Sequence, residues 1–285
     1  MTTTQQTPDA PQETRRQYWS QLMDQAAAFM DQAAEASVQE CGEPIACLKT
    51  AVAEAGVQVQ FSETTYATGH QRQYYLRERL IPGFITAAAL MNQRGWVMKV
   101  EDALRTLDMQ TNVGRQPAVF ERILKTTLWE CGDQKPSADF VLKRYRALVA
   151  VNAKVGTHTS ASAIDISVYD LKTGQEIDRG APYLEMSERT PMNSPFVSEE
   201  AHTNRQEITR IMSEGGLLAY PFEFWHYNAG DCYQSILLND GPAKYGPVNT
   251  HLPDLHVTPL ANPTAPLNTA SDMAQLVHTA LAHLD

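Results

Sequence analysis

The 285-residue sequence contains no hydrophobic run long enough to cross a membrane, and its first residues lack the basic-then-apolar order of a secretion signal. It also lacks an excess of positive charge, since its formal net charge is −10 at pH 7. That charge argues against nucleic acid or an anionic membrane surface as the main partner. We therefore expect a cytoplasmic protein whose partner is a small molecule rather than nucleic acid or a membrane.

Cysteine is scarce, and the four residues (Cys41, Cys47, Cys131 and Cys232) have no zinc-ribbon spacing. We expect them to be thiols, although Cys41 and Cys47 can pair if the compartment is oxidising. The rest is ordinary globular composition, with 43% hydrophobic and 20% charged residues. A chain of this length and composition supports one good-sized core with room for an accessory subdomain.

The chain divides by composition into three parts. Residues 1–13 are polar and carry proline, which predicts a disordered arm. Residues 14–240 are expected to form a single domain with an N-terminal helical extension. Residues 241–285 are expected to form a proline-rich, loop-like tail and a C-terminal helix packed on that domain.

Hydrophobic periodicity predicts helices and a few short strands. The expected helices cover residues 15–37, 45–55, 77–92, 119–130, 137–149, 199–215 and 271–284, and the expected strands cover 57–61, 96–100 and 165–169. A turn at 170–176, with Gly174 at a positive φ, predicts a hairpin, and a further strand is expected to carry Glu223 and His226. This order predicts an α+β fold in which a small, mostly antiparallel sheet is flanked by helices.

Two short segments carry residues that suit metal chemistry. In the first, His158 precedes Asp165 by seven positions across small residues, and in the second Glu223 precedes His226 by three. Each segment alone is more often a set of solvated or hydrogen-bonded side chains than a metal site. Together, two imidazoles and one carboxylate around an open fourth position are typical of catalytic zinc, with a glutamate left over as base.

Taken in this order, the two segments resemble the D-alanyl-D-alanine dipeptidase family, zinc enzymes that include the vancomycin-resistance dipeptidases. The family pattern is Ser-x-His-x-x-Gly-x-Ala-x-Asp followed by Glu-x-x-His, usually as Glu-Trp-Trp-His-Tyr. The residues that match it are His158, Ala163, Asp165, Glu223, Trp225, His226 and Tyr227. The resemblance implies one zinc ion per chain, held by His158, Asp165 and His226, with Glu223 as general base. It also places the zinc site at the sheet.

A third region is similar to the family's Asp-Gly-Tyr-Arg-Pro-Leu-x-Val-Gln, which lies between a strand and a helix. Asp102, Arg105, Leu107 and Gln110 fit that pattern. The resemblance implies that Arg105 stabilises the negative oxygen of the tetrahedral intermediate. Without the resemblance, Arg105 would be an ordinary surface arginine.

The sequence departs from the family where the substrate is expected to bind. Gly156 replaces the family serine, and Ala161 replaces the family glycine. In the segment similar to Phe-Asp-x-Met-x-Glu-Arg-Ser, the aspartate implied to bind the substrate ammonium is Leu184, and Glu185 follows it. An apolar residue cannot compensate a buried ammonium. We therefore count Gly156, Leu184, Glu185 and Trp225 as candidate substrate-binding residues and expect altered specificity.

Three interpretations stay open. The leading one is a zinc metallopeptidase that cleaves D-Ala-D-Ala or a related small D-amino-acid peptide. The second is a zinc amidase acting on another small amide, for example in natural-product tailoring. The third is a binding protein on the same fold, which Glu223 argues against because a protein without turnover needs no base. The histidines of the tail and last helix (His251, His256, His278 and His283) are not expected to bind metal, and the oligomeric state is left open.

Overall fold

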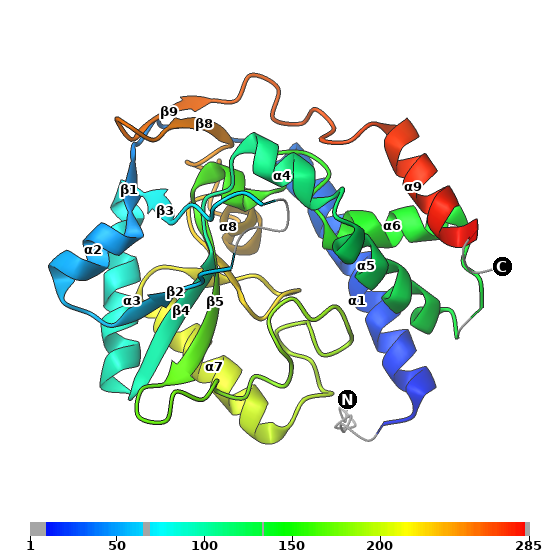
Figure 1. Ribbon diagram of the computed structural model, residues 1–285, viewed down its shortest axis with the longest axis horizontal. Helices are drawn as coiled ribbons and strands as arrows, with labels where there is room; N and C mark the ends of the chain where they lie inside the picture. Colours follow the sequence, from blue (N-terminus) through cyan, green and yellow to red (C-terminus); the bar gives the residue numbers. More distant parts are fainter. Residues whose placement is uncertain (1–9, 65–68, 133, 283–285) are drawn as a thin grey trace.

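The computed structural model describes residues 10–64, 69–132 and 134–282. Its centre is a sheet with strand order β2-β4-β5-β7-β6, in which β2 runs parallel to β4 and every other pair is antiparallel. Figure 1 labels β2, β4 and β5 of this sheet. The strands are β2 (Val59–Phe61), β4 (Trp96–Asp102), β5 (Ala163–Asp170), β6 (Leu218–Ala219) and β7 (His226–Asn228). The predicted α+β class and the mostly antiparallel sheet are confirmed.

Strand pairing brings three residues of the family motifs into one row. At the end of the β4–β5 ladder, after an irregularity, Asp102 pairs with Asp165. On its other edge β5 pairs with β7, and there Asp165 lies opposite His226. Residues far apart in the sequence therefore meet at a single level of the sheet.

Helices α3 (Ile81–Gln93) and α7 (Glu199–Glu214) pack together beside the sheet (Figure 1). Phe84, Val100, Ile166 and Ile208 belong to the core formed there and are at most 1% exposed. The two helices approach closely, because a Cβ added to Gly83 would lie 2.0 Å from the carbonyl oxygen of Gly215. Burial of these apolar side chains is the main source of stability for the sheet.

A second group of helices lies to one side of the sheet, on the right in Figure 1. It comprises α1 (Gln12–Glu35), α5 (Pro117–Glu130), α6 (Ala138–Leu148) and α9 (Ala270–Ala282). The apolar residues of α1 recur at helical spacing and form one buried stripe: Trp19, Met23, Ala26, Phe29 and Ala33. Val277 and Leu281 of α9 are buried with side chains of α5 and α6, so the C-terminal helix packs on the rest of the chain.

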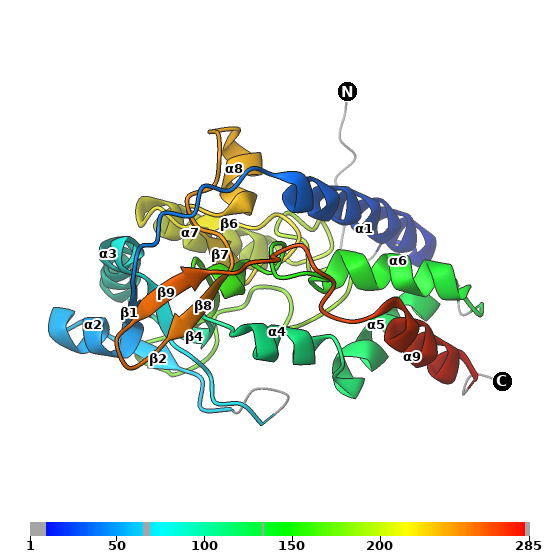
Figure 2. The same ribbon diagram turned by 90° about the horizontal axis from the view of Figure 1, so that it is seen from above.

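The remaining elements connect these two parts (Figure 2). They are β1 (Ile45–Cys47), α2 (Leu48–Ala55), β3 (Tyr75–Arg77), α4 (Leu107–Val113), α8 (Cys232–Leu238), β8 (Val248–His251), β9 (His256–Pro259) and the 3₁₀ turns Glu78–Leu80 and Thr157–Ser160. The four cysteines are free thiols, as expected. Within the described ranges, no helix is both long and apolar enough to span a membrane.

Several predicted boundaries were wrong. Residues 45–47 form strand β1 rather than helix, because they pair with β3, and residue 77 closes β3 rather than opening a helix. α3 begins at Ile81 with Pro82 in its first turn, where a proline is tolerated because its missing N–H has no partner to lose. Of the predicted arm, residues 1–9 lie outside the described residues, and α1 already begins at Gln12.

The tail was also predicted incorrectly, since residues 241–285 contain the antiparallel pair β8–β9 in addition to loop and the C-terminal helix. Asp231 starts α8 by accepting hydrogen bonds from the backbone N–H groups of Tyr233 and Gln234. The turn after β5 has Gly174 at φ 69°, as predicted. The expected hairpin is reduced to one bridge, between Tyr169 and Glu176.

Candidate metal centre

His158, Asp165 and His226 converge at one buried point. Their ligand atoms all lie within 4.8 Å of one another. Asp165 Oδ1 lies 3.3 Å from His158 Nε2 and 3.1 Å from His226 Nδ1. Because side chains alternate along a strand, Asp165 points away from the core that Ile164 and Ile166 fill. The three residues that the sequence singled out are therefore brought together.

The hydrogen bonds of the two imidazoles leave the correct nitrogens available. His158 Nδ1 lies 2.6 Å from the carbonyl oxygen of Ala103, which can only accept, so Nδ1 carries the proton and Nε2 keeps its lone pair. His226 Nε2 lies 3.1 Å from Thr157 Oγ1, so Nε2–H can donate to this hydroxyl oxygen. In that tautomer His226 Nδ1 keeps its lone pair. Both free nitrogens are the ones beside Asp165, as a metal site with fixed tautomers requires.

Asp165 is held as a carboxylate. Burial opposes its ionisation, but in the metal-free protein the protonated forms of His158 and His226, which carry charge and donate to this carboxylate, outweigh that effect and keep the pKa of Asp165 well below its usual value. Its second oxygen, Oδ2, accepts a hydrogen bond of 3.0 Å from the hydroxyl of Tyr183. Sequence reasoning missed this contact, although Tyr183 stands where the similar family segment has phenylalanine, and the added hydroxyl was the available signal.

Arg105 occupies the connection between β4 and α4, as the motif predicted. Its Nε donates to Asp102 Oδ2 at 2.8 Å and its Nη1 donates to Gln110 Oε1 at 3.2 Å. Its Nη2 lies 3.6 Å from Asp165 Oδ2. Since Asp102 is fully buried, the guanidinium is fixed at the edge of the metal cluster rather than extended into solvent.

Arg72 is a second arginine of the same cavity, and sequence reasoning missed it. Its Nη1 lies 3.5 Å from Asp102 Oδ1, and its Nε donates to the carbonyl oxygen of Thr64. The sequence around Arg72 carries no recognisable pattern that indicates this position. Asp102 thus lies between two arginines that line the cavity.

Glu223 lies in the turn that leads into β7, not on a strand as predicted. The turn is closed by a hydrogen bond of 3.2 Å from the N–H of His226 to the carbonyl oxygen of Glu223. Burial raises the pKa of Glu223 to about 7, aided by the charge of Asp165 and opposed by His226, Arg105 and a hydrogen bond with Trp225. Part of the side chain faces the cavity, so Glu223 can exchange a proton with a molecule bound there.

The cavity around these residues has a volume of about 160 Å³. One wall is polar, and the opposite wall is apolar, formed by side chains from α1, α4, α5, α6 and the 182–189 segment: Met30, Val113, Val119, Leu148, Leu184 and Met186. Trp225, a candidate substrate-binding residue, lines the cavity and packs edge-on against Tyr183, with ring centroids 5.7 Å apart. The site is therefore shared between the sheet and the second group of helices.

Of the other candidate substrate-binding residues, Leu184 and Gly156 line the cavity and Glu185 does not. Leu184 lines the cavity at φ 64°, a left-handed conformation that leucine rarely adopts. Glu185 does not line this cavity; its carboxylate accepts a hydrogen bond of 2.8 Å from Arg189 and faces a neighbouring pocket. Gly156 lines the cavity with little room for a side chain, since a Cβ there would lie 3.2 Å from Gln110 Cδ and 3.3 Å from Ala150 Cβ.

The tail histidines are remote from this cluster. His251 and His256 are exposed on β8 and β9, and His278 is exposed on α9. His283 lies outside the described residues. In the part of the chain that the structure describes, the cluster of His158, Asp165 and His226 is the one group of three or more side chains arranged to hold a metal.

Comparison with known proteins decides the family. Residues 64–241 match the family model described as D-ala-D-ala dipeptidase, Peptidase_M15. The chain belongs to the D-Ala-D-Ala dipeptidase family. The matched region of this family contains every residue of the metal cluster together with Arg72, Arg105, Tyr183 and Glu223, whereas α1 and α9 lie outside it.

Individual members of the D-Ala-D-Ala dipeptidase family are similar to shorter stretches. A D-alanyl-D-alanine dipeptidase of Enterococcus faecalis is 32% identical over 79 residues, which is 28% of this chain and 39% of that protein. One of Enterococcus faecium is 35% identical over 75 residues, 26% of this chain and 37% of that protein. One of Escherichia coli is 34% identical over 91 residues, 32% of this chain and 47% of that protein. The chain thus matches less than half the length of these relatives.

Proposed function

We propose that the protein is a zinc-dependent hydrolase that cleaves a D-Ala-D-Ala-type dipeptide or a related small D-amino-acid peptide. The observation that carries this proposal is the buried cluster of His158, Asp165 and His226, whose hydrogen bonds leave two imidazole nitrogens and a carboxylate free to bind metal. Two nitrogens and one carboxylate oxygen are a donor set typical of catalytic zinc. Membership of the D-Ala-D-Ala dipeptidase family supports the same assignment.

Zinc bound by these three residues would lower the pKa of a water molecule and polarise the scissile carbonyl. Glu223, which lines the same cavity, accepts a proton at its carboxylate and donates it to the leaving amine. The Arg105 guanidinium, fixed by Asp102 and Gln110, stabilises the negative charge that develops on the carbonyl oxygen. The apolar wall excludes water and so strengthens these electrostatic interactions.

A second candidate, a zinc amidase acting on another small amide, is favoured by Leu184. The cavity has an isobutyl side chain where a free ammonium would need a carboxylate, and the next acid, Glu185, pairs with Arg189 outside the cavity. The two candidates use the same catalytic residues and differ only in the substrate's amine side. A non-catalytic binding protein is disfavoured because Glu223 faces the cavity beside the cluster.

The test is a screen of the purified protein with D-Ala-D-Ala, L-Ala-L-Ala and N-acetyl-D-Ala-D-Ala, with released amine as the readout. We expect hydrolysis of at least one D-configured amide and loss of that activity when a chelator removes the metal. No release from any of them, with metal bound, would favour the binding-protein alternative.

Leu184→Asp should raise the preference for a free dipeptide over its N-acetyl form by about ten- to a hundredfold, because a charged hydrogen bond contributes roughly 1.5–3 kcal/mol. Aspartate tolerates the left-handed conformation at φ 64° at least as well as leucine does, so the fold should persist. Leu184→Asn is the matched control, since it adds polarity without charge. The measurement is kcat/KM for both substrates, and a wild type that already prefers the free amine strongly would contradict the assignment.

Arg105→Ala should lower kcat more than it raises KM, by roughly a hundredfold, because its contact is made with charge that develops in the transition state. Arg94→Ala, an exposed arginine after α3, is the control. A raised KM with unchanged kcat would instead make Arg105 a residue that binds the ground-state substrate.

A further inference from the structure

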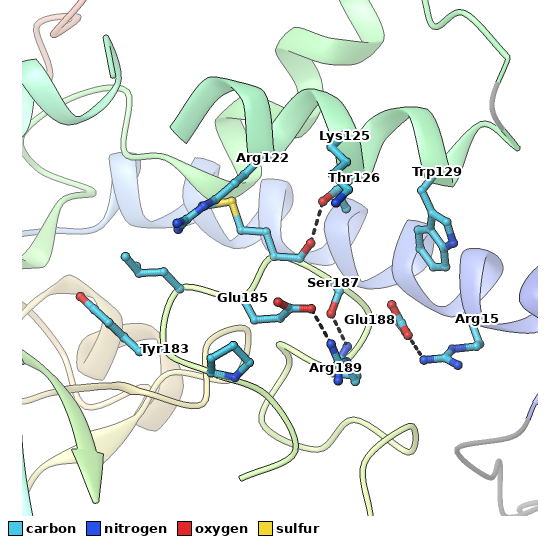
Figure 3. A pocket seen from close by; sticks show the side chains of 13 residues that line it. Arg15, Arg122, Lys125, Thr126, Trp129, Tyr183, Glu185, Ser187, Glu188 and Arg189 are labelled. Carbon is cyan, nitrogen blue, oxygen red and sulfur yellow. Dashed lines mark hydrogen bonds and ion pairs between the residues drawn. The ribbon is translucent and has the colours of Figure 1, made fainter. Parts of the chain in front are cut away.

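A second pocket, of about 520 Å³, adjoins the metal cavity. It lies between α5 and the segment of residues 182–189, as Figure 3 shows. Tyr183, Leu184 and Met186 line both this pocket and the metal cavity, so one stretch of chain forms the boundary between the two spaces. We call this second space the α5 pocket.

The α5 pocket is cationic in a chain of net charge −10. It is lined by four basic side chains and two acidic ones: Arg15, Arg122, Lys125, Arg189, Glu185 and Glu188. Both acids are already paired, Glu185 with Arg189 and Glu188 with Arg15. Two positive charges are therefore in excess.

The excess charge belongs to Arg122 and Lys125, which are exposed and one turn apart on α5. Neither makes an ion pair with any acid of the residues that the structure describes. In Figure 3 the Arg122 guanidinium extends from α5 toward the end of the pocket where Tyr183 lies, which is the end nearest the metal cavity. An anion lying between the two spaces would meet this guanidinium first.

The pocket is held in shape by contacts across its walls. Thr126 Oγ1 on α5 donates to the carbonyl oxygen of Met186 at 2.6 Å. At the base of the segment, Arg205 of α7 donates to the carbonyl oxygens of Arg179, Arg189 and Pro191 at 2.7–2.8 Å. Because the pocket is preformed, little free energy is spent on ordering its side chains and backbone when a ligand binds.

We propose that the α5 pocket binds an anionic extension on the amine side of the substrate, such as a carboxylate-bearing N-acyl group. This inference rests on the proposed function, in which Leu184 stands in place of an ammonium-binding carboxylate and the substrate therefore does not need a free amine. The acyl chain passes over Leu184 and Met186, which are apolar, and its carboxylate binds Arg122 and Lys125. The preferred substrate is then an N-acylated, negatively charged D-dipeptide rather than a free one.

The test compares N-succinyl- and N-butyryl-D-Ala-D-Ala, whose acyl chains have equal length and differ in the terminal carboxylate. Wild type should favour the succinyl substrate by about 5- to 20-fold in kcat/KM, mainly through KM, as expected for two partly exposed charge pairs. In R122Q/K125Q that ratio should fall to about 1. The control R94Q/K172Q removes the same charge beside the far ends of β4 and β5, and should keep the wild-type ratio.

A wild-type ratio near 1, or a ratio that survives in R122Q/K125Q, would overturn the α5 pocket as a substrate site while leaving the proposed function intact. Turnover of neither substrate would count against the proposed function. Calorimetry then measures the affinity of both dipeptides for wild type and for R122Q/K125Q, independently of turnover. Tighter binding of the succinyl form that is lost in the variant supports the α5 pocket as a substrate site. Equal binding of the two dipeptides to wild type overturns it.

Discussion

Glu223→Gln is expected to lower the rate of hydrolysis by about two to four orders of magnitude while the protein keeps its metal. Glutamine has the size and shape of glutamate but cannot accept the proton that the reaction releases. Glu223 lies outside the cluster of metal-binding atoms and faces the same cavity, so its replacement should spare metal binding. The measurements are kcat/KM for an active substrate and metal content by elemental analysis.

Glu214→Gln is the matched control for this prediction, because Glu214 is an exposed carboxylate at the end of α7 that pairs with Arg210. It should behave as wild type. If Glu223→Gln turned over substrate at a near wild-type rate, the role of base would have to pass to another group.

His158→Ala and His226→Ala should each lose bound zinc and about a thousandfold or more in rate. The reason is that a catalytic metal contributes several kcal/mol of transition-state stabilisation, and each 1.36 kcal/mol is about tenfold. Each variant also removes one of the two imidazoles that lie against the buried Asp165 carboxylate, so a lower thermal stability is expected as well.

His251→Ala is the control for the two ligand variants, since His251 is exposed on β8 and pairs with Asp254. It should keep wild-type metal content and rate. Full metal content in both His158→Ala and His226→Ala would show that the metal binds elsewhere.

The parts of the site that could be predicted from the sequence depend on local pattern. Alternation placed Asp165 on a strand, and the strand-to-helix change around Asp102 and Arg105 followed from periodicity and resemblance. These signals depend only on residues close together in the sequence, so they do not require knowledge of the tertiary contacts. The class of fold followed for the same reason, from the order of helices and strands.

The parts that could not be predicted depend on contacts between distant segments. β1 forms only because β3 lies beside it, and Arg72 reaches the cavity only because Asp102 lies across from it. The opposite orientations of Leu184 and Glu185 follow from the left-handed backbone at Leu184, which no apolar pattern signals. The apolar wall likewise comes from several helices that meet only in the folded chain.

Dependence of hydrolysis on one zinc ion bound by His158, Asp165 and His226 can be measured by titrating the metal-free protein with zinc while hydrolysis is followed. We expect no turnover without metal and a linear rise that stops at one equivalent per chain, with no such rise for His226→Ala. Undiminished turnover by the metal-free protein, or a rise in His226→Ala equal to that of wild type, would contradict that dependence.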